Sequence, residues 1–297
     1  MIFFLFLRIF ENKYNSQTRI ELYVQEYIPN FRSEYMCFHT SVVTPKGKVQ
    51  ERYNRLFKPG VEFDPLYHTS GFSHQEILVV TNNPERHIQV ATWGLIPKWV
   101  KTNEDATKIR NQTINARSET VFEKPSFRSA ILKGRCLVPV TGFFEWRTIG
   151  KNKYPYLISQ KEEEIFSLAG IVEEWLNKDT GELIQSVSIL TKVADPLMSI
   201  IHNEKLRMPV IVTKEKEEQW IDSTLQKQQI ELFFLPKKSL LEARSISKFV
   251  TSKSDTNTPE VLKQFAFDGI EEYFDSENLS LKPKDKPKVI QDSLFCE

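Results

Sequence analysis

The sequence predicts an α+β fold, a single domain built on a mostly antiparallel, barrel-like β-sheet with a few surrounding helices. Short β-rich runs dominate the chain from His87 onward. Turn-forming residues separate several of these runs, as in Gly150-Lys151-Asn152. The chain has 297 residues, of which 40% are apolar, and can therefore enclose a substantial core.

The expected elements follow in chain order. A helix is predicted over 48–57, where Val49, Tyr53 and Phe57 recur at helical spacing, and Pro59-Gly60 ends it. Residues 61–86 have the composition of loops. Strands are predicted over 87–94, 135–147, 154–159, 165–175, 186–192 and 209–213. Two helices, over 214–224 and 227–234, and a last strand over 243–250 complete the domain.

Both ends of the chain are expected to lie outside this domain, which we assign to residues 36–266. Residues 1–35 are interpreted as an extension, either from a start codon assigned too early or as a pro-segment. Their apolar run, 2–7, is far shorter than the roughly 20 residues of a membrane-spanning helix. Residues 267–297 contain eight acidic and four basic residues, which predicts a mobile charged tail.

The composition excludes several classes of protein. A net charge of +1 excludes a uniformly basic nucleic-acid coat but leaves room for a local basic groove. Cys37, Cys136 and Cys296 have no regular spacing, so neither a disulfide framework nor a metal site is expected. We interpret Cys136 as a small buried hydrophobic residue. The sequence predicts a cytoplasmic protein with no cofactor and no membrane association.

A methionine followed by a small nucleophilic residue is a substrate for an aminopeptidase, and Met36-Cys37 is such a pair inside the chain. A cysteine exposed as an N-terminus carries an α-amine and a thiol that together can close a five-membered ring on an aldehyde. The dipeptide is common by chance, so its interpretation depends on four blocks of residues downstream.

The first two blocks point to nucleic acid. Trp93 and Trp99 flank a segment with a glycine and a proline, which is typical either of a sealed barrel end or of a surface that stacks on a nucleobase. The second block runs from Asn115 to Thr120 in a locally basic stretch, where Arg117 suits a phosphate. The alternative is that Asn115 and Arg117 only cap the segment and pair with Glu119.

The other two blocks supply groups for proton transfer. Glu145 lies between Phe144 and Trp146. If its carboxyl is buried, desolvation raises the pKa toward neutrality, whereas regular alternation would turn it to solvent. His202 precedes a predicted strand, where a loop commonly presents a functional residue, although a single histidine is more often structural.

Taken together, the five motifs resemble the SOS response-associated peptidase (SRAP) family, the abasic-site processing proteins, in the family's order over roughly residues 36–265. The resemblance implies a DNA-damage protein whose partner is single-stranded DNA containing abasic sites. Cys37, freed of preceding residues, would form a Schiff base with the ring-opened sugar and then a thiazolidine crosslink. Crosslink reversal, strand cleavage at the abasic site and self-removal of the preceding residues are also implied.

The resemblance assigns a role to each matching residue. Asn115 would orient the catalytic Cys37, Glu145 would move protons, and His202 would assist the Schiff-base chemistry. The DNA-binding residues would be Trp93, Trp99, Arg117 and His39. A cytoplasmic monomer that joins the nucleoid when bound to DNA is expected, without metal or cofactor.

Two departures from the family pattern stand out. Phe38-His39 replaces the usual Gly-Arg after the cysteine, so the arginine's phosphate contact is either lost or made by protonated His39. His68-Thr69-Ser70-Gly71 replaces an Asn-x-Ala-Pro stretch. Two other functions remain open, a cysteine autopeptidase without a DNA role and a non-covalent binder of single-stranded DNA.

Overall fold

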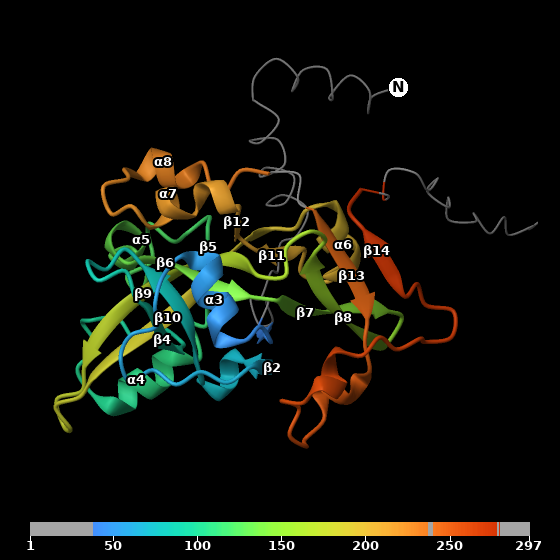
Figure 1. Cartoon of the computed structure of the whole chain (residues 1–297), viewed down its shortest axis with the longest axis horizontal. Helices are drawn as coiled ribbons and strands as arrows, with labels where there is room; N and C mark the ends of the chain where they lie inside the picture. The colour runs from blue at the N-terminus through green and yellow to red at the C-terminus, as the bar shows by residue number, and fades with distance from the viewer. Residues whose placement is uncertain (1–37, 237–239, 278, 280–297) are drawn as a thin grey trace, which may run out of the picture. The chain divides into compact units, whose positions relative to one another are not determined.

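A computed structural model describes residues 38–236, 240–277 and 279, whose strands form two sheets (Figure 1). The eight-stranded sheet contains β3 (Glu76–Thr81), β4 (Ile88–Trp93), β5 (Asn115–Arg117), β6 (Arg135–Val140), β9 (Phe166–Leu176), β10 (Leu183–Val193), β11 (Arg207–Pro209) and β12 (Ile211–Val212). Five of its strands close into a barrel in the order β10-β4-β3-β6-β9, because β9 also pairs with β10. Only β4 and β5 run parallel to β10 among the described strand pairs, which confirms a mostly antiparallel, barrel-like fold.

The second sheet is antiparallel throughout and has the order β14-β13-β8-β7-β1-β2. Its strands are β1 (His39–Val42), β2 (Leu66–Ser70), β7 (Gly142–Ile149), β8 (Asn152–Gln160), β13 (Leu241–Ser245) and β14 (Tyr273–Asp275). The α-helices are α3 (Lys46–Tyr53), α4 (Asn103–Arg110), α5 (Ala130–Lys133), α6 (Pro196–Ile201), α7 (Glu217–Ile221) and α8 (Lys227–Glu231). Short 3-10 turns are η1 (Gly71–Ser73), η2 (Lys214–Lys216), η3 (Lys248–Thr251) and η4 (Pro259–Leu262). In the described part of the chain no helix is long and apolar enough to cross a membrane.

The barrel strands are buried on both faces. Along β3, Leu78 and Val80 pack in one core with residues of α3 and α7, whereas Ile77 and Val79 pack in a second core with residues of β7 and β8. Alternate residues of a strand point to opposite faces, so a strand between two cores must be apolar throughout. The second core joins the barrel to the six-stranded sheet.

The structure differs from the sequence prediction in several elements. The predicted strand 135–147 is two strands, because at Thr141 the chain leaves the barrel and enters the other sheet. The predicted loop 61–86 contains β2 and β3. The helix ends at Tyr53, four residues early, because Asn54 adopts a left-handed conformation with φ of 49°. Likewise, 209–213 divides into β11 and β12, and α4, α5, α6, β1 and β5 were not predicted.

The predicted tail begins too early. Residues 273–275 form β14, whose Phe274 pairs with Ala243 of β13. The side chain of Phe274 also packs on Tyr156, with ring centroids 5.8 Å apart. One of the acidic residues that suggested disorder, Asp275, therefore lies in the strand that completes the sheet edge, where it pairs with Lys161 at 3.0 Å. Most of the predicted tail, from 280 to 297, lies outside the described residues, as does the whole of 1–35.

Candidate functional site

The centre of the candidate site is a buried pair, Glu145 and His202. Glu145 on β7 is 3% exposed, and His202, at the C-terminal end of α6, is 6% exposed. Nδ1 of His202 lies 3.6 Å from Oε1 of Glu145 and 3.0 Å from the carbonyl oxygen of Arg207. Because a carbonyl oxygen only accepts, Nδ1 carries the proton of neutral His202 and Nε2 presents a lone pair. The structure thus brings together two of the predicted residues, and Glu145 does not face solvent.

Strand β1 leads the chain to this pair. Thr40 of β1 pairs with Phe143 of β7, two residues before Glu145 in the same strand. The N–H of Gly71 donates to the carbonyl oxygen of Phe38 at 2.8 Å. The Phe38 ring also packs against Phe72, with centroids 4.7 Å apart. Cys37 itself lies outside the described residues, and its predicted role stays a prediction.

Trp93 packs beneath Gly71, the residue whose N–H binds the carbonyl oxygen of Phe38. Its ring is fully buried, and its indole N–H donates to the carbonyl oxygen of Ile114 at 3.0 Å. A Cβ added at Gly71 would lie 2.3 Å from Cγ2 of Ile114 and 3.2 Å from the Trp93 ring. Only glycine therefore fits where the chain anchors Phe38. The prediction that Trp93 stacks on a base is wrong, because a fully buried ring offers no face to a ligand, and the barrel-core alternative holds.

Asn115 and Arg117 lie on β5, on one side of β10. Asn115 is 6% exposed and pairs with Ile189 of β10, while Arg117 is half-buried and pairs with Thr191. Burial, followed by the charge of Arg207, lowers the pKa of the Arg117 guanidinium, and Glu119 opposes this shift. Asn115 directly follows Ile114, the residue that packs under Gly71. Strand β5 thus begins directly after Ile114, the residue against which Gly71 packs.

An ion pair that the sequence did not indicate crosses the end of β10. Arg207 of β11, 2% exposed, binds both carboxylate oxygens of Glu119, with Nη2 at 2.9 Å from Oε2. The same nitrogen donates to the carbonyl oxygen of Thr191 at 2.9 Å. We call this Glu119–Arg207 pair the β10 clamp. It ties the segment directly after β5, the strand that bears Asn115, to β11, where the carbonyl of Arg207 orients His202.

The charge state of the β10 clamp follows from its contacts. Burial disfavours ionisation of Glu119, but the hydrogen bonds and charge of Arg207 outweigh it and lower the pKa of the carboxyl. The carboxylate is therefore ionised at neutral pH. The alternative in which Glu119 simply pairs with Arg117 is incomplete, since its hydrogen-bonded ion pair is with Arg207.

His39 is not a cation in this fold. Its Nδ1 lies 2.8 Å from Nε2 of His68, the two rings stack with centroids 5.0 Å apart, and Nδ1 of His68 contacts Oγ1 of Thr256 at 2.6 Å. Burial and, second, the neighbouring His68 lower the pKa of His39 to about 3. The idea that protonated His39 replaces the family's arginine at a phosphate is wrong, because desolvation keeps the ring neutral.

Two further residues are settled by their exposure. Trp99 is 56% exposed, and its indole N–H donates to the carbonyl oxygen of Pro125 at 3.3 Å, so one predicted aromatic ring is open to a ligand. Cys136 is fully buried, and burial raises the pKa of its thiol. The expectation of a buried hydrophobic residue at Cys136 is confirmed.

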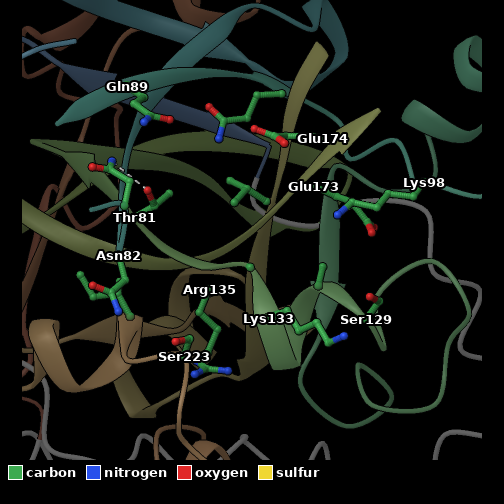
Figure 2. Close-up of a pocket in the computed structure, with 16 residues that line it drawn as sticks. Thr81, Asn82, Gln89, Lys98, Ser129, Lys133, Arg135, Glu173, Glu174 and Ser223 are labelled. Atoms are coloured by element: carbon green, nitrogen blue, oxygen red, sulfur yellow. Dashed lines mark hydrogen bonds between the residues drawn. The ribbon is translucent and has the colours of Figure 1, made fainter. Parts of the chain in front are cut away.

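A cavity of about 310 Å³ lies elsewhere on the barrel. Figure 2 shows Lys98, Ser129 and Lys133 along one side of it, with Thr81, Asn82 and Gln89 across from them. Glu145, His202, Asn115 and Arg117 do not line this cavity. Within the described ranges no group of three or more His, Cys, Asp or Glu side chains could hold a metal ion.

The chain is similar to a solved structure and to proteins named for abasic site processing, as follows. A crystal structure of a protein from Bacteroides thetaiotaomicron is 42% identical, covers 77% of this chain and all of its own, and superimposes with a TM-score of 0.72. The abasic site processing protein YoqW of Bacillus subtilis is 33% identical over 233 residues, 77% of this chain and 99% of that protein. The abasic site processing protein HMCES of Gallus gallus is 32% identical over 170 residues, about half of each chain.

The model of the SOS response associated peptidase (SRAP) family matches residues 36–253. The matched segment contains every described residue of the candidate site, from Phe38 to Arg207. It also contains all five strands of the closed barrel. Since the match spans most of the chain, this protein belongs to the SRAP family.

Proposed function

We propose that this protein processes abasic sites in single-stranded DNA and becomes covalently joined to them through Cys37. The observation that carries the proposal is the buried Glu145–His202 pair, in which Glu145 lies two residues after Phe143, the β7 partner of Thr40 in β1. A carboxyl and an imidazole held within 3.6 Å can act as a proton donor and a proton acceptor for a nucleophile. Relatives named for abasic site processing support the same assignment.

The first step joins the amine to the sugar. An abasic site in its ring-opened form exposes an aldehyde at C1′. The neutral α-amine of Cys37, whose ordinary pKa is about 8, attacks this carbon to give a carbinolamine. Protonated Glu145 donates a proton to the departing hydroxyl, water leaves, and a Schiff base forms.

The second step closes the ring. The Glu145 carboxylate takes the thiol proton of Cys37 while the sulfur attacks the Schiff-base carbon, and the nitrogen keeps its proton. One C–N and one C–S bond form, one water is released, and no oxidant or reductant is needed. The product is a thiazolidine, and the same steps in reverse release the DNA.

His202 serves the Schiff-base stage. With Nδ1–H held on the Arg207 carbonyl, Nε2 can accept a proton. Removal of a C2′ proton from the Schiff base forms a C2′–C3′ double bond as the C3′–O bond breaks and the phosphate leaves. This β-elimination is strand cleavage, and we propose it as the protein's lyase activity.

The proposal requires a free amine on Cys37. Translation from Met36 followed by methionine removal would supply it, as would self-removal of residues 1–36, the peptidase activity that the family name denotes. The start of the family match at Met36 supports a boundary there. We propose that residues 36–277 act as one DNA-binding and catalytic unit, as a monomer. Asn115 would hold the cysteine, Arg117 a phosphate, and Trp99 a base.

The test uses a chain that begins at Met36, mixed with single-stranded DNA carrying one abasic site and analysed on a denaturing gel. We expect an adduct that Cys37→Ser abolishes and Glu145→Gln slows, whereas Cys296→Ser, the matched thiol control, leaves it unchanged. An adduct that survives Cys37→Ser contradicts the proposal. Equal non-covalent binding of intact and abasic strands, with no adduct, would favour a simple single-strand binder instead.

A further inference from the structure

An exposed basic segment continues directly from the candidate site. After Arg117 the chain forms successive turns, in which the N–H of Lys124 donates to Thr120, that of Arg128 to Lys124, and that of Lys133 to Ser129. We call residues 120–134 the basic turn. Its backbone is hydrogen-bonded along its length, so its side chains project from a fixed support.

The cations of the basic turn have no anionic partners among the described residues. Lys124, Arg128 and Lys133 are exposed, and none of them makes an ion pair within the described part of the chain. Other exposed cations do pair, as Lys108 does with Glu104 at 2.6 Å. Glu123 is the single acidic residue in this segment. The surface therefore carries a net positive charge that is not neutralised internally.

Trp99 lies beside these cations. Its indole N–H donates to the carbonyl oxygen of Pro125 at 3.3 Å, in the middle of the basic turn. The neighbouring Lys98 lines the same cavity as Ser129 and Lys133 (Figure 2). Lys98 is accompanied by the buried Glu173, so we do not count it among the unpaired charges. The exposed indole ring thus lies against the segment that carries the three cations.

We propose that the basic turn and Trp99 form a second DNA-binding surface, which holds the backbone and one base of the strand that flanks the abasic site. The proposal rests on the proposed function and extends it from the reacting nucleotide to its neighbours. Phosphates require cations without competing carboxylates, and bases stack on exposed aromatic rings whatever their sequence. The basic turn starts three residues after Arg117, so it is continuous in sequence with the candidate site.

The experiment compares strands with about 3 and about 15 nucleotides on each side of the abasic site, because one single-strand-binding fold covers about 4–16 nucleotides. The variants are Lys124→Gln/Arg128→Gln/Lys133→Gln and Trp99→Ala. The matched control is Lys58→Gln/Lys151→Gln/Lys178→Gln, three exposed lysines that likewise make no ion pair with a described residue. Adduct formation and non-covalent binding of undamaged strands are both measured between low and high salt.

With long strands we expect the triple variant to reduce the slope of log affinity against log salt by about 2, since each phosphate contact to a single strand contributes about 0.7. Trp99→Ala should weaken binding of long strands roughly 5- to 150-fold. With short strands the triple variant should form adduct at the rate of the unchanged protein.

Two results would contradict the proposed DNA-binding surface. One is an equal salt dependence of affinity for the triple variant and its lysine control, and the other is an equal loss of adduct formation with short and long strands. Failure of the proposed function appears differently, as no adduct with either strand. In that case binding of the undamaged long strand still decides whether the surface holds DNA. A triple variant that binds the strand normally but loses an acidic protein partner also contradicts the proposal.

Discussion

The β10 clamp provides a sharp test of how the site is held. We consider Glu119→Gln, which keeps the size of the side chain but removes its charge. In the structure Arg207 is 2% exposed, while the Glu119 side chain is 35% exposed. The guanidinium keeps its hydrogen bond to the Thr191 carbonyl, and glutamine still offers one acceptor.

The expected loss of stability is moderate. Hydrogen bonds to charged groups contribute about 1.5–3 kcal/mol, and partial exposure of Glu119 together with the remaining acceptor reduces this value. We therefore expect Glu119→Gln to lower the free energy of unfolding by about 1–2 kcal/mol. At about 2–4 °C per kcal/mol for a domain of this size, the melting temperature should fall by about 2–8 °C.

The effect on function should exceed the effect on stability. The weaker contact to glutamine lets Arg207 shift, and with it the backbone carbonyl that orients His202; a misplacement of about 1 Å can slow catalysis by about 100-fold. We expect crosslink reversal and strand cleavage to slow roughly 10- to 100-fold, with binding of undamaged DNA unchanged.

A second ion pair supplies the control. Arg55 has a 1% exposed side chain and pairs with Glu218 at 3.0 Å, through residues that follow α3 and lie in α7. Glu218→Gln should cost comparable stability without changing reversal. Equal slowing by the two glutamine variants would refute a positioning role for Glu119, since a general loss of stability would then explain both.

Three further predictions concern the frame of the site. Gly71→Ala, whose Cβ would lie 2.3 Å from Ile114, should destabilise the fold by about 1–3 kcal/mol and impair adduct formation, which thermal unfolding and the gel assay would show together. Trp93→Ala should cost about 3–5 kcal/mol in urea unfolding because it leaves a cavity in the core. Burial lowers the pKa of His39 to about 3 and that of His68 to about 4. As the pH falls, the two imidazoles are therefore protonated in the unfolded chain before they are protonated in the folded protein. Stability should be complete above about pH 6.5 and fall as the pH drops toward 4. Asparagine at both positions should flatten that part of a melting-temperature profile, and an unchanged profile would contradict the neutral pair.

The sequence predicted the elements whose patterns are local. The α+β class, the central strands and the two short helices near Lys214 and Lys227 follow from residue composition, periodicity and turn residues. Strand β3 was missed because a short apolar run between loop-forming residues resembles neither a half-buried strand nor an amphipathic helix. The division between β6 and β7 was missed because one continuous β-rich run passes through two sheets. No local pattern marks the point where it changes partners.

The candidate site shows the same limit. Glu145 and His202 could be singled out as chemical groups, but their approach to 3.6 Å depends on how α6 packs against β7. The partner of Glu119 lies 88 residues away, so no spacing rule could reveal it. Burial decided the remaining cases, because it moved Trp93 from a binding surface to the core and made His39 neutral. The identity of a tryptophan or histidine does not reveal whether the fold buries its side chain.

The junction of the two sheets holds Phe38, the residue that follows Cys37 in the sequence. The N–H of Thr141 donates to the carbonyl oxygen of Ser41 at 2.8 Å, so the crossing between β6 and β7 also holds β1. A Cβ at Gly142 would approach the Leu157 side chain to 2.8 Å, which shows how closely the strands pass there. Phe38 is fixed at one end by β1 and at the other by the N–H of Gly71, which rests on the barrel core. The eight-stranded sheet supplies the buried Trp93 and Asn115, whereas the second sheet supplies Glu145 and the strand β1 that follows Phe38. Neither sheet alone contains a site, so activity should depend on their junction more than on the stability of either sheet.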